Sequence, residues 1–293
     1  MTIVGDGDLK FELDPDWPRG MPEAWLFTLA SDVAVDSRDR VFVFSRGRHP
    51  VTVWTPDGDF ITSWGEGEFK DPHGIYIDAS DNIWLTDTQR HVVTKNTQQG
   101  DILLELGTRD HAYPTTGPDG QNGLPFNMPS GVALNAEGDI FVSDGYGNRR
   151  VHRFSPDGDL QKSWGRGGKG PGEFALLHNI GIDERGRVFI CDRENSRIQL
   201  FDQDGKYLEE WTDILNPGDV YMGPDHLVYV AEQGRPTGVS IFTLDGELLS
   251  RWRGPEAGME APHGIWGDSA GNVYVAEIGR PGHGQRVRKY VRR

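Results

Sequence analysis

A sixteen-residue pattern that recurs six times constrains the fold of this chain more than any other feature. Each copy places two short apolar runs around a turn rich in Asp, Asn and Gly, as in PHGIYIDASDNIWLTD and PSGVALNAEGDIFVSD. The copies follow one another at intervals of 42, 57, 48, 40 and 45 residues, and they begin at Ala30, Pro72, Pro129, Leu177, Pro217 and Pro262. Regular self-similarity at this period indicates a repeat architecture.

The residues inside each repeat predict β-strands. The two apolar runs alternate around turn residues, and a third run, such as RIQLF, leads to an Asp-Gly turn. A fourth run often ends in Trp-Gly, as in FITSWG and LQKSWG. The sequence contains no 3.6-residue apolar stripe long enough for a helix. Four short strands per repeat are typical of a propeller blade, so we expect an all-β, six-bladed β-propeller.

The two ends of the chain are expected to close the ring. The sixth repeat stops after its third strand, RVRKYV, whereas DLKFELD at residues 8–14 precedes the first repeat without a partner. This segment is predicted to supply the missing outer strand, so that residues 1–293 form a single propeller domain. An insertion at residues 109–123 and the loop around residues 277–284 are expected to shape a pocket mouth.

Composition narrows the class of partner. The chain has a net charge of −15, which disfavours a nucleic acid as partner. No apolar run reaches 18 residues, and the N-terminus lacks the basic start and apolar centre of a secretory leader. The single cysteine, Cys191, lies in the apolar run VFICD, so we expect a core residue and no intramolecular disulfide. These features favour a cytoplasmic protein without a membrane partner, and they do not predict an oligomeric state.

Histidines occupy the second position of alternate repeats. In repeat order this position reads Ser31, His73, Ser130, His178, Gly218 and His263. Because the first strand of every blade lines the central channel, three histidines in every other blade would form a triangle around the axis. Three neutral imidazoles with an open fourth direction suit a catalytic Zn²⁺ ion, whereas a lone histidine at a strand start more often only packs or hydrogen-bonds. The other six histidines share no repeat position and are expected in loops or at the surface: His49, His91, His111, His152, His226 and His283.

A second set of polar residues follows the second strand of each repeat and is expected to point at the metal. It includes Arg46, Asp87, Glu232, Glu277 and the stretches DGYGNRR and DRENSR. Tyr146 could transfer a phenolic proton near a cation, and Arg46 and Arg193 could hold a carboxylate or a developing oxyanion. Asp144 and Asp192 recur between repeats and are interpreted as turn formers. Arg149 and Arg197, in the N-x-R pattern, are interpreted as bridges between blades.

These motifs resemble NHL repeats, and over residues 25–290 they resemble peptidyl-α-hydroxyglycine α-amidating lyase. The specific similarities are VSDGYGNRRVHRFSPDG, FALLHNI and CDRENSRIQLF. The resemblance implies a six-bladed propeller with zinc on His73, His178 and His263. It further implies a catalytic Tyr146 and two substrate-region arginines, Arg46 and Arg193. The implied reaction cleaves the C–N bond of a carbinolamide, R-CO-NH-CH(OH)-COOH, into a primary amide and glyoxylate, so the implied partner is a small molecule or a peptide end.

The chain departs from this lyase pattern at several points. The family has Met-Pro-His-Asp at the third histidine, where this chain has Ala261 and Gly264 around Pro-His. That Asp helps to hold a structural calcium, so a Ca²⁺ site here would depend on Asp32 with Val33 and Ile75, and Asp219 shares the repeat position of Asp32. Gly147 and Leu200 stand where the secreted enzymes have half-cystines. We expect no hydroxylating monooxygenase domain.

Two other functions compete with the lyase interpretation. The first is a metal-dependent hydrolase or lactonase on a related propeller, which usually has acidic and Asn ligands to calcium around the channel. The second is an NHL module that binds a partner without catalysis, and its signature would be a basic or apolar face. The histidine-rich ring and the acidic, isolated domain favour the zinc lyase over both.

Overall fold

The computed structural model describes residues 2–20, 29–113, 125–254, 258–279 and 285–293. Within them, six large antiparallel sheets correspond to the six repeats, and the fold is the predicted all-β, six-bladed propeller. The one helical element among these residues is a single 3₁₀ turn, and none of them belongs to a helix that could traverse a bilayer. The chain groups into two compact units, residues 69–217 and residues 1–68 with 218–293.

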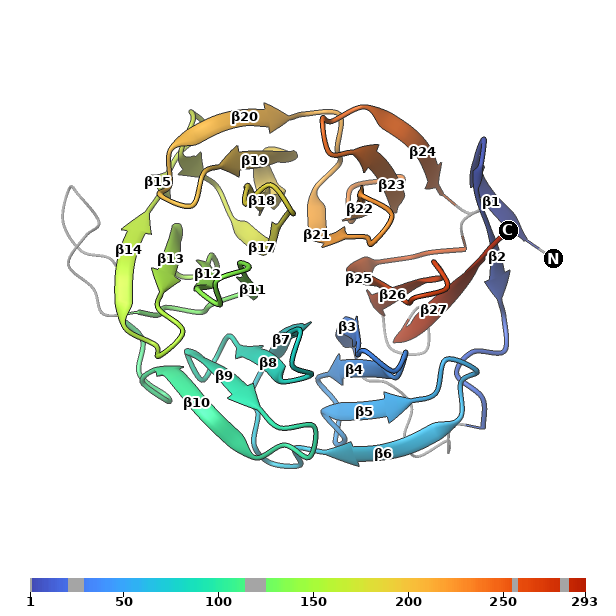
Figure 1. The fold of residues 1–293 in the computed structure, drawn as a ribbon, viewed down its shortest axis with the longest axis horizontal. Coiled ribbons are helices and arrows are strands. Elements are labelled where there is room, and N and C mark those ends of the chain that lie inside the picture. Colours follow the sequence, from blue (N-terminus) through green and yellow to red (C-terminus); the bar gives the residue numbers. More distant parts are fainter. Residues whose placement is uncertain (1, 21–28, 114–124, 255–257, 280–284) are drawn as a thin grey trace. The chain divides into compact units, whose positions relative to one another are not determined.

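The unit of residues 69–217 contains the second, third and fourth blades, coloured cyan to yellow in Figure 1. Each blade is a four-stranded sheet with its strands in chain order. The second blade comprises β7 (Pro72–Ile77), β8 (Ile83–Asp87), β9 (Val92–Asn96) and β10 (Ile102–Gly107). The third comprises β11 (Gly131–Leu134), β12 (Ile140–Asp144), β13 (Arg150–Phe154) and β14 (Leu160–Trp164). The fourth comprises β17 (Leu177–Ile182), β18 (Val188–Asp192), β19 (Arg197–Phe201) and β20 (Tyr207–Trp211).

The connection between the third and fourth blades carries the Gly-rich stretch GRGGKG. It forms a short parallel pair, β15 (Arg166–Gly167) with β16 (Glu173–Phe174), and leads into a strand. The 3₁₀ turn η2 (Arg193–Asn195) follows β18. The Gly-rich stretch GRGGKG is therefore part of the connection between the third and fourth blades, and it lacks the helix that a nucleotide-binding glycine loop requires.

Burial separates the strands of each blade. The second strands β8, β12 and β18 are fully buried, whereas the fourth strands β10 and β14 are largely exposed. Aromatic and aliphatic side chains fill the space between adjacent blades, with Trp84 and Val132 in one cluster and Phe141 and Ile190 in the next. The first strand β11 contacts both β7 and β17, so the starts of the three first strands lie near one another.

The unit of residues 1–68 and 218–293 contains the first, fifth and sixth blades. The first blade comprises β3 (Ala30–Val35), β4 (Val41–Ser45), β5 (Val51–Trp54) and β6 (Phe60–Trp64). The fifth comprises β21 (Pro217–Met222), β22 (Leu227–Glu232), β23 (Gly238–Thr243) and β24 (Leu248–Arg253). The sixth comprises β25 (Pro262–Gly267), β26 (Val273–Ile278) and β27 (Gln285–Arg292), extended by β2 (Leu9–Asp14) and β1 (Ile3–Asp6).

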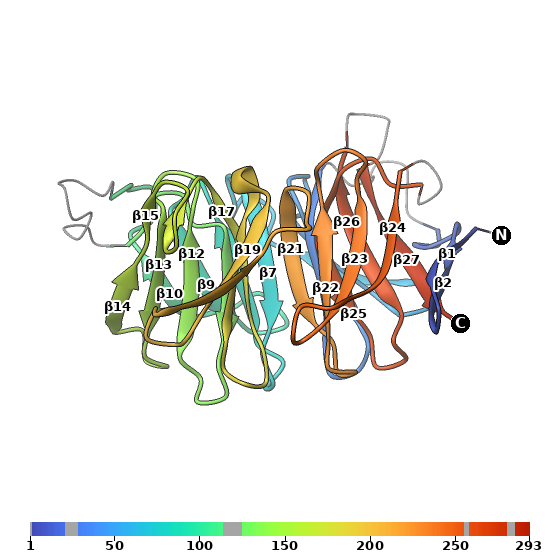
Figure 2. The ribbon, with the colours of Figure 1, turned by 90° about the horizontal axis from the view of Figure 1, so that it is seen from above.

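The N-terminal segment completes the sixth blade, as predicted. Strand β2 pairs antiparallel with β27, with Phe11 opposite Arg292, so the two termini lie side by side in Figures 1 and 2. Strand β1 was not predicted; it folds back on β2 through a turn at Gly7, whose φ of +54° suits glycine. The predicted insertion at 109–123 and the loop at 277–284 lie largely outside the described residues, which stop at 113 and 279 in these stretches.

Candidate metal centre

Two of the predicted ligand histidines lie against each other in the unit of residues 69–217. His73 is the second residue of β7 in the second blade, and His178 is the second residue of β17 in the fourth blade. Both side chains are buried, and their ring centroids are 4.8 Å apart. Two imidazoles this close can present nitrogens to one shared ion. The pair therefore fits the predicted placement of ligand histidines at the same position of alternate blades.

The tautomer of His73 follows from its hydrogen bonds. Nδ1 lies 2.6 Å from the main-chain carbonyl oxygen of Ser130 in the third blade. A carbonyl can only accept, so Nδ1 carries the proton and Nε2 carries the lone pair. The Tyr146 hydroxyl lies 3.0 Å from that Nε2. This arrangement, with one ring nitrogen held by the protein and the other available, is the usual way in which proteins prepare a metal-binding histidine.

The loop after β12 places Tyr146 beside both histidines. A Cβ at Gly145 would collide with the carbonyl of Leu177, so only glycine lets this loop rest on the start of the fourth blade. The Tyr146 ring lies 5.8 Å from the His178 ring and 5.1 Å from the His73 ring. These contacts place the tyrosine beside two of the histidines predicted to bind the metal.

Arg193 lies on the other side of Tyr146. Its guanidinium is 5.8 Å from the centroid of the tyrosine ring, and its Nε is 2.9 Å from Glu194 Oε1. The main-chain N–H of Arg193 donates to the carbonyl of Leu176, which fixes the start of η2. Tyr146 thus contacts Arg193 on one side and the two histidines on the other.

The glycine after His73 is explained by the same contacts. A Cβ at Gly74 would lie 2.7 Å from the Ser130 carbonyl oxygen and 2.8 Å from Thr86 Oγ1. Thr86 Oγ1 accepts from the Gly74 N–H at 2.7 Å and lies 3.1 Å from the Ser130 carbonyl oxygen. Glycine thus allows the second blade to approach the carbonyl group that orients His73, and this accounts for the recurring Pro-His-Gly.

The sixth blade repeats this arrangement in the other unit. His263 is the second residue of β25, is buried, and places Nδ1 2.6 Å from the carbonyl oxygen of Ser31 in the first blade. A Cβ at Gly264 would collide with Asp32. His73 and His263 therefore have the same tautomer, the same type of carbonyl partner and the same need for a following glycine.

Gly264 stands where the lyase pattern has an Asp, and carboxylates from the first and fifth blades lie near this position. Asp32 lies against Gly264, and its Oδ1 accepts from the Val33 N–H at 2.8 Å. Asp219, at the same repeat position of the fifth blade, shares a hydrogen bond with Asp32 and accepts from the Ile265 N–H at 2.8 Å. Burial raises the pKa of Asp219 to about 7, against the effect of these hydrogen bonds. Val33 and Ile75, the other predicted calcium residues, are buried in β3 and β7.

The acidic side chains after the second strands, including Asp144 and Asp192, which were interpreted as turn formers, are buried and hydrogen-bonded. The Asp144 carboxylate accepts from the Asn127 N–H, and that of Asp192 accepts from the Ala175 N–H. The carboxylate of Glu277 likewise accepts from the Glu260 N–H, and Asp87 and Glu232 are buried in the same way. Each carboxylate accepts hydrogen bonds from main-chain N–H groups or basic side chains of its own blade and of the connection that enters the blade. A buried N–H group without an acceptor would lower the stability of the fold.

The basic residues of this second set divide into two groups. Arg149 donates to the carbonyl of Ala175, and Arg197 binds Asp192 and the carbonyls of Gly170 and Glu173, so the predicted bridging role is supported. Arg46 follows β4 at the repeat position of Arg193, and its N–H donates to the carbonyl of Leu29 as that of Arg193 does to Leu176.

Two further sequence expectations concern buried side chains. Cys191 is buried and free, as predicted. His152 is not a surface residue, as had been expected; it is buried in β13, with Nδ1 2.6 Å from Ser163 Oγ and Nε2 3.4 Å from Asp144 Oδ2.

Comparisons with known proteins agree with this fold. A family model described as a 6-bladed beta-propeller matches residues 124–232. NHL repeat-containing protein 3 from Homo sapiens is 32% identical over 300 residues, which cover 97% of this chain and 84% of that protein. Peptidyl-glycine alpha-amidating monooxygenase B from Xenopus laevis is 27% identical over 316 residues, covering 92% of this chain but only 35% of that protein.

A solved structure gives the same result for the fold alone. The structure of a putative gluconolactonase aligns with a TM-score of 0.69 at 15% identity, and the alignment covers 99% of this chain and 97% of that one. Identity above 30% over most of both sequences is specific evidence of common descent, and the six repeats fold into six blades. The chain therefore belongs to the family of NHL-repeat six-bladed β-propellers, homologous to NHL repeat-containing protein 3 and, at lower identity, to peptidylglycine amidating enzymes.

Proposed function

We propose that this protein is a metal-dependent lyase that cleaves the C–N bond of an α-hydroxy amide. The proposed substrate is an N-acyl- or peptidyl-α-hydroxyglycine, and the products are a primary amide and glyoxylate. The observation that carries the proposal is the Tyr146 hydroxyl, 3.0 Å from Nε2 of His73 and packed against His178. A proton-transferring group beside prepared imidazoles is what such a cleavage needs. The homology to amidating enzymes supports this choice of substrate class.

The proposed metal ligands are His73, His178 and His263, which are all buried and could together hold an ion. They fit a divalent metal because Nδ1 of His73 and of His263 is committed to a carbonyl, which leaves Nε2 as the ligand atom. Three neutral imidazoles favour zinc over calcium, which prefers oxygen ligands. When bound, zinc would act as a Lewis acid on the substrate oxygen atoms. Calcium remains a second proposal, with Asp32 as its carboxylate ligand.

The side chains of this chain would perform the proton transfers. Tyr146, present as the phenolate that a bound cation favours, would accept the proton of the substrate hydroxyl and become a phenol as the C–O bond becomes a carbonyl and the C–N bond breaks. The same phenol would return the proton to the departing amide nitrogen, so that atoms and charges balance. Arg193, next to the tyrosine ring, would hold the carboxylate that becomes part of glyoxylate. Arg46 would provide the equivalent contact from the first blade.

The test combines metal analysis with a product assay. Protein purified without added metal would be analysed by mass spectrometry and then assayed for glyoxylate release from N-benzoyl-α-hydroxyglycine. We expect about one zinc per chain and catalytic glyoxylate release. His178→Ala should lose zinc and activity, whereas Tyr146→Phe should keep zinc and lose turnover. His111→Ala, at an exposed histidine, is the matched control.

Each alternative function gives a different result. Stoichiometric metal without glyoxylate release would favour a hydrolase or lactonase on the same propeller. Absence of transition metal would favour a non-catalytic NHL module. Unchanged turnover in Tyr146→Phe would remove the tyrosine from the mechanism, and retained zinc in His178→Ala would refute the ligand assignment.

A further inference from the structure

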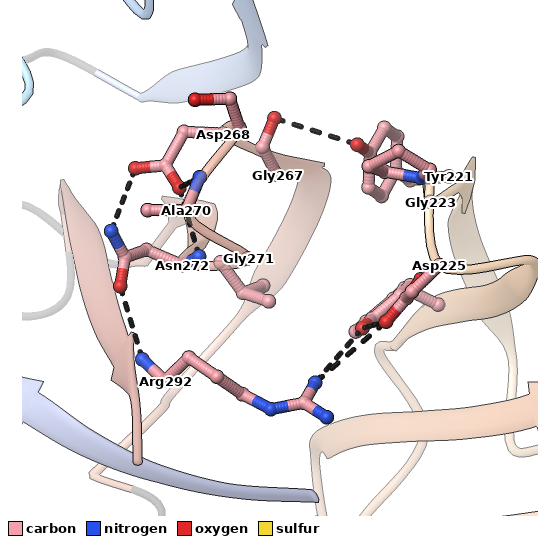
Figure 3. A pocket seen from close by; sticks show the side chains of 13 residues that line it. Tyr221, Gly223, Asp225, Gly267, Asp268, Ala270, Gly271, Asn272 and Arg292 are labelled. Carbon is pink, nitrogen blue, oxygen red and sulfur yellow. Dashed lines mark hydrogen bonds and ion pairs between the residues drawn. The ribbon is translucent and has the colours of Figure 1, made fainter.

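Polar side chains around the turns after β21 and β25 are paired with one another (Figure 3). Tyr229 donates to Asp225 Oδ2 at 2.7 Å, and the Arg292 guanidinium lies 3.7 Å from the same oxygen. Burial raises the pKa of Tyr229, and the Asp225 carboxylate adds to this effect, so the phenol keeps its proton near neutral pH. These three side chains therefore form a fixed link between β22, β27 and the turn after β21.

His91, in the unit of residues 69–217, differs from this cluster because an imidazole can change its charge near neutral pH. It is a half-buried residue that immediately precedes β9, and its φ of +58° is in the left-handed region. Its Nδ1 accepts from the main-chain N–H of Met128 at 3.1 Å. Nδ1 therefore carries the lone pair, and the proton of the neutral ring is on Nε2.

The segment that this histidine holds also carries the loop of the proposed catalytic tyrosine. The Tyr146 N–H donates to the Met128 carbonyl oxygen at 3.3 Å, and the Gly147 N–H donates to the Asn127 carbonyl oxygen at 3.0 Å. The same loop places the Tyr146 hydroxyl 3.0 Å from Nε2 of His73. The position of the hydroxyl therefore depends on the position of the main chain at residues 127–128.

A matching contact at the entry to the fifth blade uses a group that does not titrate. Ser196 has the repeat position of His91, and its φ of +51° is also left-handed. Its Oγ accepts from the N–H of Asn216 at 3.3 Å, and Asn216 precedes the fifth blade as Met128 precedes the third. Met128 and Asn216 are left-handed as well, with φ of +66° and +46°, and residues other than glycine keep this conformation only where neighbouring contacts hold it. The imidazole of His91 thus makes a recurring contact sensitive to pH.

Burial and charge act in opposite directions on the pKa of His91. Burial is the largest effect and lowers the pKa below its ordinary value of 6.5. The carboxylates of Asp144, Asp87 and Asp110 raise it, whereas the Lys70 ammonium lowers it. The imidazole is therefore neutral at pH 7 and can accept at Nδ1. A protonated ring would turn an N–H toward the main-chain N–H that it now accepts from, so this hydrogen bond would be lost.

We propose that His91 is a positioning residue for Tyr146, which it holds beside His73 through the main chain of Met128, and that protonation of His91 releases this hold. This proposal rests on the proposed role of Tyr146 in C–N cleavage. Neutral His91 would keep the Tyr146 hydroxyl at the proposed metal centre, and acid would allow the strained Met128 segment and the attached loop to move.

The first experiment observes Tyr146 directly, so it does not depend on turnover. The whole chain, as purified, would be labelled with ¹³Cζ-tyrosine, and the Tyr146 resonance would be assigned by its absence in Tyr146→Phe. We expect the wild-type resonance to shift between pH 5 and 7.5, with a step whose midpoint lies below 6.5. Since other histidines near the ring also affect this resonance, the comparison with variants isolates the part that His91 contributes.

Two substitutions at position 91 separate the acceptor from the charge. His91→Asn keeps an acceptor, suits the left-handed backbone and does not titrate, so the step should disappear while the resonance at pH 7.5 stays unchanged. His91→Leu has a similar volume but no acceptor, so its resonance at pH 7.5 should already be displaced toward the acid position of the wild type. His111→Asn, at an exposed histidine, is the matched control and should titrate as the wild type does.

The second experiment measures glyoxylate release. His91→Leu should lower kcat at pH 7.5 by roughly 10- to 100-fold with a smaller change in KM, because the base is displaced rather than removed. His91→Asn should keep kcat at pH 7.5 and lose less of it in acid than the wild type. Equal kcat and equal pH profiles in the wild type and both variants would overturn the proposal.

The two experiments distinguish failure of this proposal from failure of the lyase function. If the Tyr146 resonance titrates identically in the wild type, His91→Asn and His91→Leu, the positioning role is wrong, whether or not the protein releases glyoxylate. If the resonance responds as expected but no variant and no wild-type sample releases glyoxylate, the link from His91 to Tyr146 is supported and the lyase function alone is refuted.

Discussion

The glycine that follows the first ligand histidine offers a sharp test of how the blades meet. Gly74→Ala adds one methyl group, whose carbon would lie 2.7 Å from the Ser130 carbonyl oxygen and 3.3 Å from Gly131 Cα. These two atoms are main chain, so they cannot move aside as the end of a flexible side chain could. The same carbonyl accepts the Nδ1–H of His73. The substitution should therefore disturb both the contact between blades and the orientation of the histidine.

The expected cost follows from two opposing terms. Overpacking of a well-packed core typically costs about 1–3 kcal/mol. Replacement of Gly by Ala restricts the unfolded chain and returns about 0.4–1 kcal/mol. We expect Gly74→Ala to lower the free energy of unfolding by about 1–2 kcal/mol, which corresponds to a fall in Tm of about 2–8 °C. Because the Ser130 carbonyl fixes the His73 tautomer, metal affinity should fall by about 10- to 100-fold.

Gly170→Ala is the matched control, since its added methyl would meet only the end of the Glu173 side chain, at 3.2 Å. Both variants gain the same unfolded-state term, so the difference between them isolates the steric effect. The assay is urea denaturation of the metal-free proteins, followed by competition titration with zinc. If Gly74→Ala were as stable as Gly170→Ala and bound zinc as tightly, the argument that this glycine is required for the approach of the two blades would be refuted.

Two further predictions concern stability. His91 Nδ1 accepts from the Met128 N–H at 3.1 Å, and burial holds the pKa of His91 below the ordinary value of 6.5, so the unfolded chain binds the proton first. The free energy of unfolding should therefore fall as pH drops below about 6.5, and it should fall less steeply in His91→Asn. Urea denaturation at pH 5 to 8 measures this, and parallel curves for the two proteins would contradict it. Phe11 is buried on β2, and its ring lies 5.2 Å from the ring of Trp252, so it joins the N-terminal strand to the core. Phe11→Ala should lower the free energy of unfolding by about 3–5 kcal/mol, whereas Ile3→Ala, at an exposed residue, should lower it by less than about 0.5 kcal/mol. Equal effects of the two substitutions in thermal and urea unfolding would show that β2 does not stabilise the fold.

Much of the site could be predicted because residues at the same position of each repeat occupy the same place in each blade. Once the six copies are aligned, His73 and His178 fall at the same height on alternate blades, and Tyr146 and Arg193 follow the second strands of the blades that meet there. In the structure these four residues lie in contact within one unit, and their role at a metal stays a prediction. The closing strand β2 was predictable for the same reason, since the sixth repeat lacked its fourth strand.

The direction of a buried polar side chain could not be predicted in this way. The repeat pattern indicated that Asp144 and Asp192 form turns, but it did not show that their carboxylates accept from main-chain N–H groups of the connections between blades. Main-chain N–H groups in those connections need acceptors, and a sequence does not show which N–H groups a neighbouring blade leaves unsatisfied. His152 was assigned wrongly for a related reason, because its partner Ser163 belongs to the next strand.

The sequence by itself thus determined the number of blades, the order of their strands and the positions of the candidate ligands, because these follow from a period that any alignment of the repeats reveals. Only the tertiary structure decided which nitrogen of His73 is held by a main-chain carbonyl and why glycine follows this histidine. Those features depend on contacts of a few ångströms between residues from different repeats. Close packing at such contacts is set by the neighbouring blade, and it leaves no periodic signal in the chain.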